Sequence, residues 1–317
     1  MKQQKKWIMQ IAQALFCALV LTACGGGDDD LSEPSTPTPQ SVNPSDPTPG
    51  NNDCADIINL EPSINGMTTR GTIDNHWLAN GSELVAVKIG SEVRQYYVND
   101  KRCMVSNNPF SWDGDFTDHA GRSVTAWYPY SATLGAERSV HANQEEDGLD
   151  SSDFLYGTSS VSYQGSGTWV YPIMFYHQVS KLVITVTNEI PGDTRTVTAI
   201  QVLNTCLTGT FAEPVSVNFG SWTTTTGSDA PITAKAVSGG WNAIAIPQTI
   251  TSGTQFVTIT LSDASTKTFT MPSDFTLLAG KVHECRFNIK EKGLTLTTTI
   301  HDWTSEERGN PGSWSTQ

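Results

Sequence analysis

Short segments of alternating apolar and polar residues, running from about residue 54 to residue 303, constrain this chain more than any other feature. In Lys181–Thr187, for example, Leu182, Ile184 and Val186 fall on one side of an extended backbone. Turn signals such as Asn80-Gly81 separate the segments. The sequence therefore predicts strands at Leu84–Ile89, Val93–Val98, Ser123–Trp127, Lys181–Thr187, Thr196–Leu203, Asn242–Ile246, Gln255–Leu261, Lys267–Met271, Val282–Ile289 and Leu294–Ile300.

The expected fold class is all-β, because no stretch shows a long amphipathic helix. Leu is sparse while Thr, Ser, Gly and Val are abundant, which is a composition typical of strands. A length of 317 residues exceeds one ordinary domain, and this many strands suggests two β-sandwiches. A turn-rich stretch near Gly165–Tyr171 places the expected boundary, which gives an N-terminal domain at 54–170 and a C-terminal domain at 171–317.

The first 23 residues are predicted to be an export signal. Lys2, Lys5 and Lys6 form a basic region, and the apolar stretch that follows is shorter than a membrane-spanning helix. The segment ends in Leu21-Thr22-Ala23-Cys24, which resembles a bacterial lipobox, so that Cys24 would carry palmitate and other acyl chains. The alternative is an ordinary cleaved signal with a chance cysteine.

Residues 24–53 are predicted to be a disordered tether rich in Pro, Ser and Thr. Asp28-Asp29-Asp30, close behind Cys24, resembles the surface-export signal of Bacteroidetes lipoproteins, although a plain solvated spacer explains the triplet equally well. The expected location is the outer face of the outer membrane, where the lipid anchor holds the folded part away from the bilayer.

The charge excludes a nucleic-acid partner. The chain has 19 Lys and Arg residues against 32 Asp and Glu, a formal charge of −13, and loss of the signal would remove three lysines. A protein that binds DNA or RNA would show a basic surface in its bulk charge.

The sequence contains no recognisable catalytic constellation. The six histidines are scattered, and neither a nucleophile elbow nor a phosphate-binding loop occurs. Asp113-Gly114-Asp115 with Asp118 comes nearest to a calcium loop but lacks its spacing and its closing Glu. We therefore expect no enzymatic activity, no metal and no cofactor.

Aromatic residues and cysteines leave alternatives open. Six aromatic residues either line a sugar-binding surface or belong to the core and rim of a sandwich, and the second interpretation is favoured: Trp112, Trp127, Tyr128, Tyr130, Trp169 and Tyr171. Four candidate disulfide cysteines, which allow three pairings, are instead buried thiols in the alternative interpretation: Cys54, Cys103, Cys206 and Cys285.

The order of several landmarks is informative. Met67-Thr68-Thr69-Arg70-Gly71 precedes Ala126-Trp127-Tyr128-Pro129-Tyr130 and Asp153-Phe154-Leu155-Tyr156-Gly157, which are followed by Phe175–Leu182, Leu278-Ala279-Gly280-Lys281 and Ile300-His301-Asp302-Trp303. Behind a lipobox and a tether, this succession resembles the fimbrillin-like family of Bacteroidetes lipoproteins over roughly residues 55–303.

That resemblance implies two transthyretin-like β-sandwich domains and a structural, adhesive role in surface fimbriae. It also implies cleavage by a trypsin-like protease between Arg70 and Gly71, loss of the strand region Asp56–Thr69, and assembly with other fimbrial subunits by strand exchange. An exposed loop arginine is the alternative interpretation of Arg70. A disulfide at Cys54 would hold the cut strand in place and argue against its release.

The C-terminal residues are a poor donor strand, because residues 304–314 are polar and include Pro311. Leu294–Ile300 is the better candidate, and a tip or anchor role remains an alternative to a shaft role. A different class of function is a monomeric surface lipoprotein that binds glycans or other ligands on host or bacterial surfaces through exposed aromatic residues.

Overall fold

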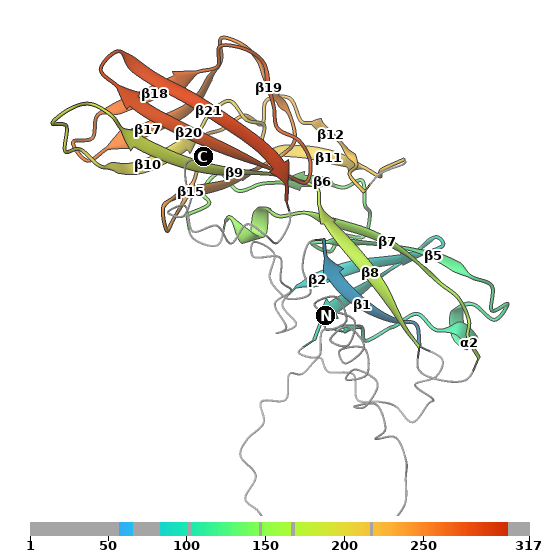
Figure 1. The fold of residues 1–317 in the computed structure, drawn as a ribbon. Coiled ribbons are helices and arrows are strands. Elements are labelled where there is room, and N and C mark those ends of the chain that lie inside the picture. Colours follow the sequence, from blue (N-terminus) through green and yellow to red (C-terminus); the bar gives the residue numbers. More distant parts are fainter. Residues whose placement is uncertain are drawn as a thin grey trace, which may run out of the picture. The chain divides into compact units, whose positions relative to one another are not determined.

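The computed structural model describes residues 57–65, 83–99, 103–145, 148–165, 169–215 and 218–303. Strands are the dominant element of these residues, and the helices among them are two single turns, α2 (Trp112–Asp115) and η1 (Asp150–Ser152) (Figure 1). The prediction of an all-β fold is confirmed. Within the described part of the chain, no helix is long and apolar enough to cross a membrane.

The first sheet closes on itself as a barrel in the order β1-β4-β3-β2-β5-β7-β8. Neighbouring strands pair antiparallel, except that β1 and β8 run parallel. Gly157 lets β7 approach β8 closely, because a Cβ atom there would lie 2.4 Å from the Met174 carbonyl oxygen. The strands are β1 (Asn59–Ile64), β2 (Leu84–Ile89), β3 (Glu92–Val98), β4 (Met104–Val105), β5 (Arg122–Tyr128), β7 (Leu155–Val161) and β8 (Val170–His177).

The later strands form a β-sandwich. A five-stranded sheet has the order β14-β15-β9-β20-β21, and a four-stranded sheet has the order β13-β10-β17-β18. Their inward side chains, such as Ile184 and Phe287 from one sheet and Ile200 and Ile259 from the other, belong to one buried core. The strands are β9 (Ser180–Asn188), β10 (Val197–Val202), β13 (Ile232–Thr233), β14 (Lys235–Val237), β15 (Gly240–Ala245), β17 (Gln255–Leu261), β18 (Thr266–Thr270), β20 (Lys281–Lys290) and β21 (Gly293–Asp302).

Two small sheets complete the described part. One has the order β12-β11-β6, from β6 (Glu137–Ser139), β11 (Thr208–Ala212) and β12 (Ser221–Thr224), and the other pairs β16 (Thr249–Ile250) with β19 (Phe275–Thr276). Each of the ten strands predicted from the alternating pattern is present, with ends within two residues of the prediction.

The expected domain boundary between residues 170 and 171 falls at the first residue of β8, a strand that pairs with β1 and β7 in the barrel. Residues 137–144 lie earlier in the chain than β8, yet they pair with later strands, since β6 pairs with β11 and Asn143 bridges Thr233. A division into two domains therefore remains a proposal. In this division the N-terminal barrel continues to His177, at the end of β8, and residues 137–144 belong to the C-terminal sandwich.

A buried glutamine joins this added segment to the sandwich. The Gln144 side chain donates from Nε2 to the Ile244 carbonyl oxygen (2.8 Å) and accepts from the Ile244 N–H at Oε1 (2.7 Å). Gln144 is fully buried, so its amide takes the place of a neighbouring strand for both polar groups of Ile244.

We expect Gln144→Ala to lower the free energy of unfolding by about 2–3 kcal/mol, because the donor and the acceptor of Ile244 would lose their partners in a dry environment. Urea denaturation followed by circular dichroism measures the change. The matched control is Gln255→Ala on the exposed side of β17, which should change stability by less than about 0.5 kcal/mol. Equal losses in the two variants would contradict the role assigned to Gln144.

His283 is a buried histidine on β20 that stays neutral. Burial lowers its pKa to about 4, and His301 on β21 adds a smaller effect in the same direction. The Leu278 N–H donates to Nε2 at 3.0 Å, a hydrogen bond that needs the unprotonated nitrogen. The folded protein therefore excludes a proton that the unfolded chain accepts near pH 6.5.

Between about pH 6.5 and pH 4 the unfolded chain binds this proton and the folded protein does not, so stability should fall as the pH falls. The loss attributable to His283 should reach about 3 kcal/mol at the acidic end. His283→Gln should flatten the curve of unfolding free energy against pH in this window, whereas Gln255→Ala, which changes no titratable group at an exposed position, should leave its slope unchanged. A slope that is identical in wild type and His283→Gln would contradict the assignment.

Candidate functional site

Strand β1 is the candidate site, because the chain at this point lies between two partners that come from different parts of the sequence. Residues Asn59–Ile64 pair in parallel with Val170–Phe175 of β8, and Leu60 pairs with Met104 of β4 on the other side. Ile58, Leu60 and Ile64 point inward and are each 1% exposed. The strand thus completes both the backbone pairing and the apolar interior of the barrel.

The beginning of β1 is held by residues 109–111. The Ile58 N–H donates to the Phe110 carbonyl oxygen (2.9 Å), and the Phe110 N–H donates to the hydroxyl oxygen of Tyr96 (2.8 Å). Burial raises the pKa of Tyr96 to about 12, so the phenol stays protonated at neutral pH. At the other end, the Asn65 N–H donates to the Phe175 carbonyl oxygen (2.7 Å), which continues the pairing with β8.

The acidic residues that came nearest to a calcium loop brace this region instead. Arg94 donates to Asp115 and to the Pro109 carbonyl oxygen (2.7 Å). Burial alone would raise the pKa of Asp115, but the bonds from Arg94 and the Ser111 N–H outweigh it and hold the pKa below its usual range. Arg122 pairs with Asp118, and His119 contacts Asp113 at 2.8 Å. Across the described ranges, no group of three or more His, Cys, Asp and Glu residues is arranged to hold a metal ion.

Several predicted site residues lie outside the described residues. They are the lipidation cysteine Cys24, the cleavage residues Arg70 and Gly71, and Cys54. Arg70 nevertheless follows the end of β1 by six positions in the sequence and precedes β2. Cleavage after Arg70 would therefore break the only direct chain connection from β1 to β2.

The cysteines in the described part of the chain do not form disulfides with one another. Cys285 is buried in the core, and this burial raises its pKa to about 12. Cys206 is half-buried, and its thiol donates to a carboxylate oxygen of Asp229 at 3.2 Å. Both are thiols, so neither forms a disulfide with another described cysteine. Cys103 lies half-buried just before β4.

The six aromatic residues, for which a sugar-binding surface is the alternative interpretation, do not form one surface group. Trp112 is only 3% exposed, in edge contact with Phe116 and Tyr163, and Trp127 is fully buried. Trp112 is a core residue, as the favoured interpretation predicts, because the turn α2 directs its ring into the barrel core. Trp169 is 48% exposed, while Tyr128, Tyr130 and Tyr171 are half-buried.

Four of the landmark motifs meet in space. Asp153 Oδ1 and His177 Nδ1 lie 3.0 Å apart in a fully buried pair, although 24 residues separate them in the sequence. The Trp303 ring stacks on the His177 ring, with centroids 3.8 Å apart and an interplanar angle of 2°. The Gly280 carbonyl oxygen accepts a hydrogen bond from the backbone N–H of Trp303 at 3.0 Å. The motifs are therefore parts of one buried junction rather than separate sites.

Comparison with known proteins identifies the family. The sequence matches the family model described as fimbrillin-like over residues 64–303, which is more than half of the chain. The chain belongs to the fimbrillin-like family. No curated protein sequence matches this fimbrillin-like chain.

Two solved structures with TM-scores above 0.5 share the fold of this fimbrillin-like chain. A protein from Bacteroides ovatus, described as a "putative cell adhesion protein", is 18% identical with a TM-score of 0.59, over 79% of this chain and 99% of that one. A protein of the same description from Bacteroides uniformis is 18% identical with a TM-score of 0.56, over 78% and 99%. A tip fimbrial protein from Porphyromonas gingivalis is 10% identical with a TM-score of 0.45, over 78% and 99%.

Strand β8 is the part of the site that sequence reasoning missed. Its residues supply the whole parallel register for β1, but the stretch was interpreted as a domain boundary. The signal was present in the apolar run Val170-Tyr171-Pro172-Ile173-Met174-Phe175. Pro172 obscured it, because proline lacks the N–H that an ordinary central strand donates.

Replacing the two tryptophans separately tests the assignment of burial. We expect Trp112→Ala to lower the free energy of unfolding by about 3–5 kcal/mol, because it removes a large buried ring from the barrel core. Trp169→Ala should cost less than about 1 kcal/mol, since almost half of that side chain is exposed. Urea denaturation of both variants measures the difference, and a larger loss at Trp169 than at Trp112 would contradict the structure.

Proposed function

We propose that this fimbrillin-like protein is a structural and adhesive subunit of cell-surface fimbriae that is lipidated at Cys24 and assembled by strand exchange after cleavage at Arg70. Membership of the fimbrillin-like family supports a fimbrial role. The description of two proteins of similar fold as cell adhesion proteins is consistent with it. The lipid would hold the precursor at the outer membrane, and other fimbrial subunits would be its partners.

The observation that carries the proposal is the position of β1. Its removal would leave the β8 backbone from Val170 to Phe175 without its parallel partner, and would open the inner positions of Ile58, Leu60 and Ile64. An exposed strand edge beside an apolar groove binds an extended segment through main-chain hydrogen bonds and alternate side chains. A strand from a neighbouring subunit would satisfy both requirements.

The proposal has two forms, which differ in whether the subunit donates a strand of its own. Strand β21 contains the predicted donor Leu294–Ile300 and pairs with β20 over Gly293–Asp302. It is an edge strand whose side chains are all half-buried or exposed, so main-chain bonds hold it more than core packing does. Donating β21 would require it to leave β20. A subunit that accepts a strand without donating one would act at the tip or the anchor.

The alternative of a monomeric glycan-binding lipoprotein loses part of its original basis. Its argument rested on aromatic residues at the surface, and Trp112 and Trp127 are buried. Trp169 alone among the three tryptophans of that set is exposed to a large extent.

Limited proteolysis with a trypsin-like enzyme tests strand exchange. We expect cleavage after Arg70 to yield a chain that begins at Gly71 and to convert monomer into polymers, because the opened groove can then accept a second chain's strand. N-terminal mass spectrometry and size-exclusion chromatography with electron microscopy measure the two steps. Arg70→Ala should block both, and Arg102→Ala is the matched control that should block neither. A clean cut at Arg70 that leaves only monomers and retains residues 57–65 on the protein would refute strand exchange.

A further inference from the structure

Strand β21 ends the five-stranded sheet, and no strand of the described chain pairs with its outer side (Figure 1). It is ten residues long and pairs with β20 over its whole length without a bulge. Edge strand β18 of the four-stranded sheet contacts β21, so both sheets of the sandwich end on the same side. An open edge of this kind presents a row of unpaired backbone N–H and C=O groups to solvent.

Two hydrogen bonds show which backbone groups of β21 face outward. The Glu189 N–H donates to the Ile289 carbonyl oxygen (2.9 Å), so Ile289 turns its backbone groups to β9 and its neighbours in β20 turn theirs to β21. At the other end of the ladder, the Trp303 N–H donates to the Gly280 carbonyl oxygen (3.0 Å). Because bonded and non-bonded pairs alternate in an antiparallel ladder, the odd-numbered residues of β21 bond to β20. The residues whose N–H and C=O groups face outward include Leu294, Leu296, Thr298 and Ile300.

The edge of β21 lacks the features that protect other edges of the sandwich. No proline, lysine or arginine occurs between Gly293 and Asp302. By comparison, β18 carries Lys267, and β14 at the opposite edge of the same sheet is three residues long and begins with Lys235. Native proteins block open edges with charges, prolines, bulges or short length. A long edge without these features is therefore suited to pairing with another strand.

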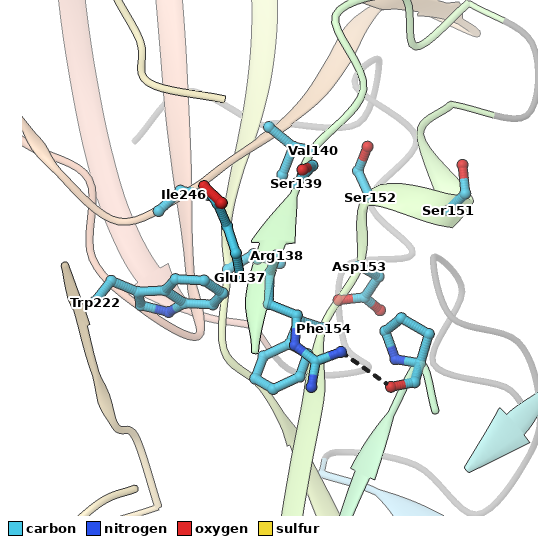
Figure 2. A pocket seen from close by; sticks show the side chains of 12 residues that line it. Glu137, Arg138, Ser139, Val140, Ser151, Ser152, Asp153, Phe154, Trp222 and Ile246 are labelled. Carbon is cyan, nitrogen blue, oxygen red and sulfur yellow. Dashed lines mark hydrogen bonds between the residues drawn. The ribbon is translucent and has the colours of Figure 1, made fainter. Parts of the chain in front are cut away.

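The pocket of about 190 Å³ beside β6 differs from this edge, because its charged side chains have partners within the chain (Figure 2). Arg138 donates to the Pro129 carbonyl oxygen (3.3 Å). Glu137 accepts a hydrogen bond from the Thr225 hydroxyl (2.8 Å). These groups are engaged inside the protein, whereas the outer edge of β21 is open to a partner.

We propose that β21 pairs antiparallel with β21 of a second copy of this chain, about a two-fold axis between the two Thr297 residues. In this register Leu294 lies opposite Ile300 of the other copy, and Leu296 lies opposite Thr298. These are the residues whose backbone groups face outward, so each opposite pair exchanges two main-chain hydrogen bonds. The two five-stranded sheets then continue as one sheet.

The side chains of β21 suit this register on both faces of the sheet. On the face toward the core, Leu294 is half-buried and Ile300 is 44% exposed, and the pairing places these two apolar side chains next to each other. On the other face, Thr295 lies opposite Thr299, and Thr297 lies opposite its own copy. Apolar pairs and threonine pairs at opposite positions both stabilise neighbouring strands.

Charge at the ends of β21 is also complementary. Asp302 of one copy lies opposite the exposed Lys292 of the other, and the two-fold axis repeats this pair at both ends. Between these two positions His301 is the only titratable residue, and it lies opposite Gly293. Like charges therefore do not meet. Centring the pair on Thr298 instead would set Leu294 against Asp302, which is why Thr297 is the preferred centre.

This pairing goes beyond strand exchange and does not depend on it. Strand β21 stays on β20, no cleavage at Arg70 is needed, and β1 keeps its place in the barrel. The contact is isologous, because both copies use the same surface.

Oxidative cross-linking of the purified, uncleaved chain tests the pairing. Thr297→Cys should form a disulfide-linked dimer, because opposite residues of a non-bonded pair lie about 4.5 Å apart at Cα, within the range of a disulfide. Thr223→Cys, at an exposed position of the shorter edge strand β12, is the matched control and should cross-link no more than wild type. Non-reducing gel electrophoresis and peptide mass spectrometry measure the linkage.

Sedimentation velocity measures the dimer without a cross-link. Detergent is present, so that the lipid predicted at Cys24 does not drive association. Wild type should be mostly dimer at about 100 μM, and Thr297→Lys should weaken the dimer about tenfold or more, because two like charges then meet at the axis. Thr223→Lys and Arg70→Ala should dimerise as wild type does. Circular dichroism confirms that each variant is folded.

A wild-type chain that is monomeric at this concentration would overturn the inference. So would Thr297→Cys that cross-links no more than Thr223→Cys, or a dimer that persists unchanged in folded Thr297→Lys. Loss of the dimer in Arg70→Ala would also overturn it, because association would then depend on cleavage. Failure of strand exchange leaves all of these expected results unchanged, so the two proposals are tested separately.

Discussion

The buried pair of Asp153 and His177 is the interaction on which much of the remaining structure depends. A carboxylate in the interior needs a hydrogen-bonded partner, and the imidazole at the end of β8 provides one at 3.0 Å. That imidazole in turn stacks on the Trp303 ring, and the backbone N–H of Trp303 donates to the Gly280 carbonyl oxygen. One pair thereby fixes the end of the barrel, the segment after η1 and the end of β21 relative to one another.

Buried glutamine side chains perform a similar task for loops. Gln144 pairs with Ile244, while Gln178 accepts from the Gly220 N–H (3.0 Å) and donates to the Asn218 carbonyl oxygen (2.9 Å). Gln248, which is half-buried, accepts from the Cys206 N–H (2.9 Å) and donates to the Cys206 carbonyl oxygen (3.2 Å). An amide carries a donor and an acceptor without charge, so it can complete an irregular backbone in the interior at a lower desolvation cost than a charged group.

Sequence reasoning predicted the strands well where alternation alone decides structure. The segment at Lys181–Thr187 became β9 because Leu182 and Ile184 have a core to face, and this requirement is local. The same reasoning missed β8, whose Pro172 argues against a central strand. The favoured interpretation of Trp112 as a core residue agrees with the structure, where a one-turn helix capped by Ser111 holds it. The partners of Gln144 and Asp153 were beyond prediction, because they lie 100 and 24 residues away and no local pattern encodes those distances.

The parallel direction of β1 against β8 has a consequence for larger assemblies. A replacement strand that keeps the register of β1 must enter the groove with the same orientation, since the reverse orientation would need a different hydrogen-bond pattern. The donor surface and the acceptor groove would then be different parts of the same molecule. Contacts of this heterologous kind do not close into a symmetric pair, and they build an open fibre with two unlike ends. Such a fibre would be polar, because each subunit would offer a donor strand to one neighbour and an acceptor groove to the other.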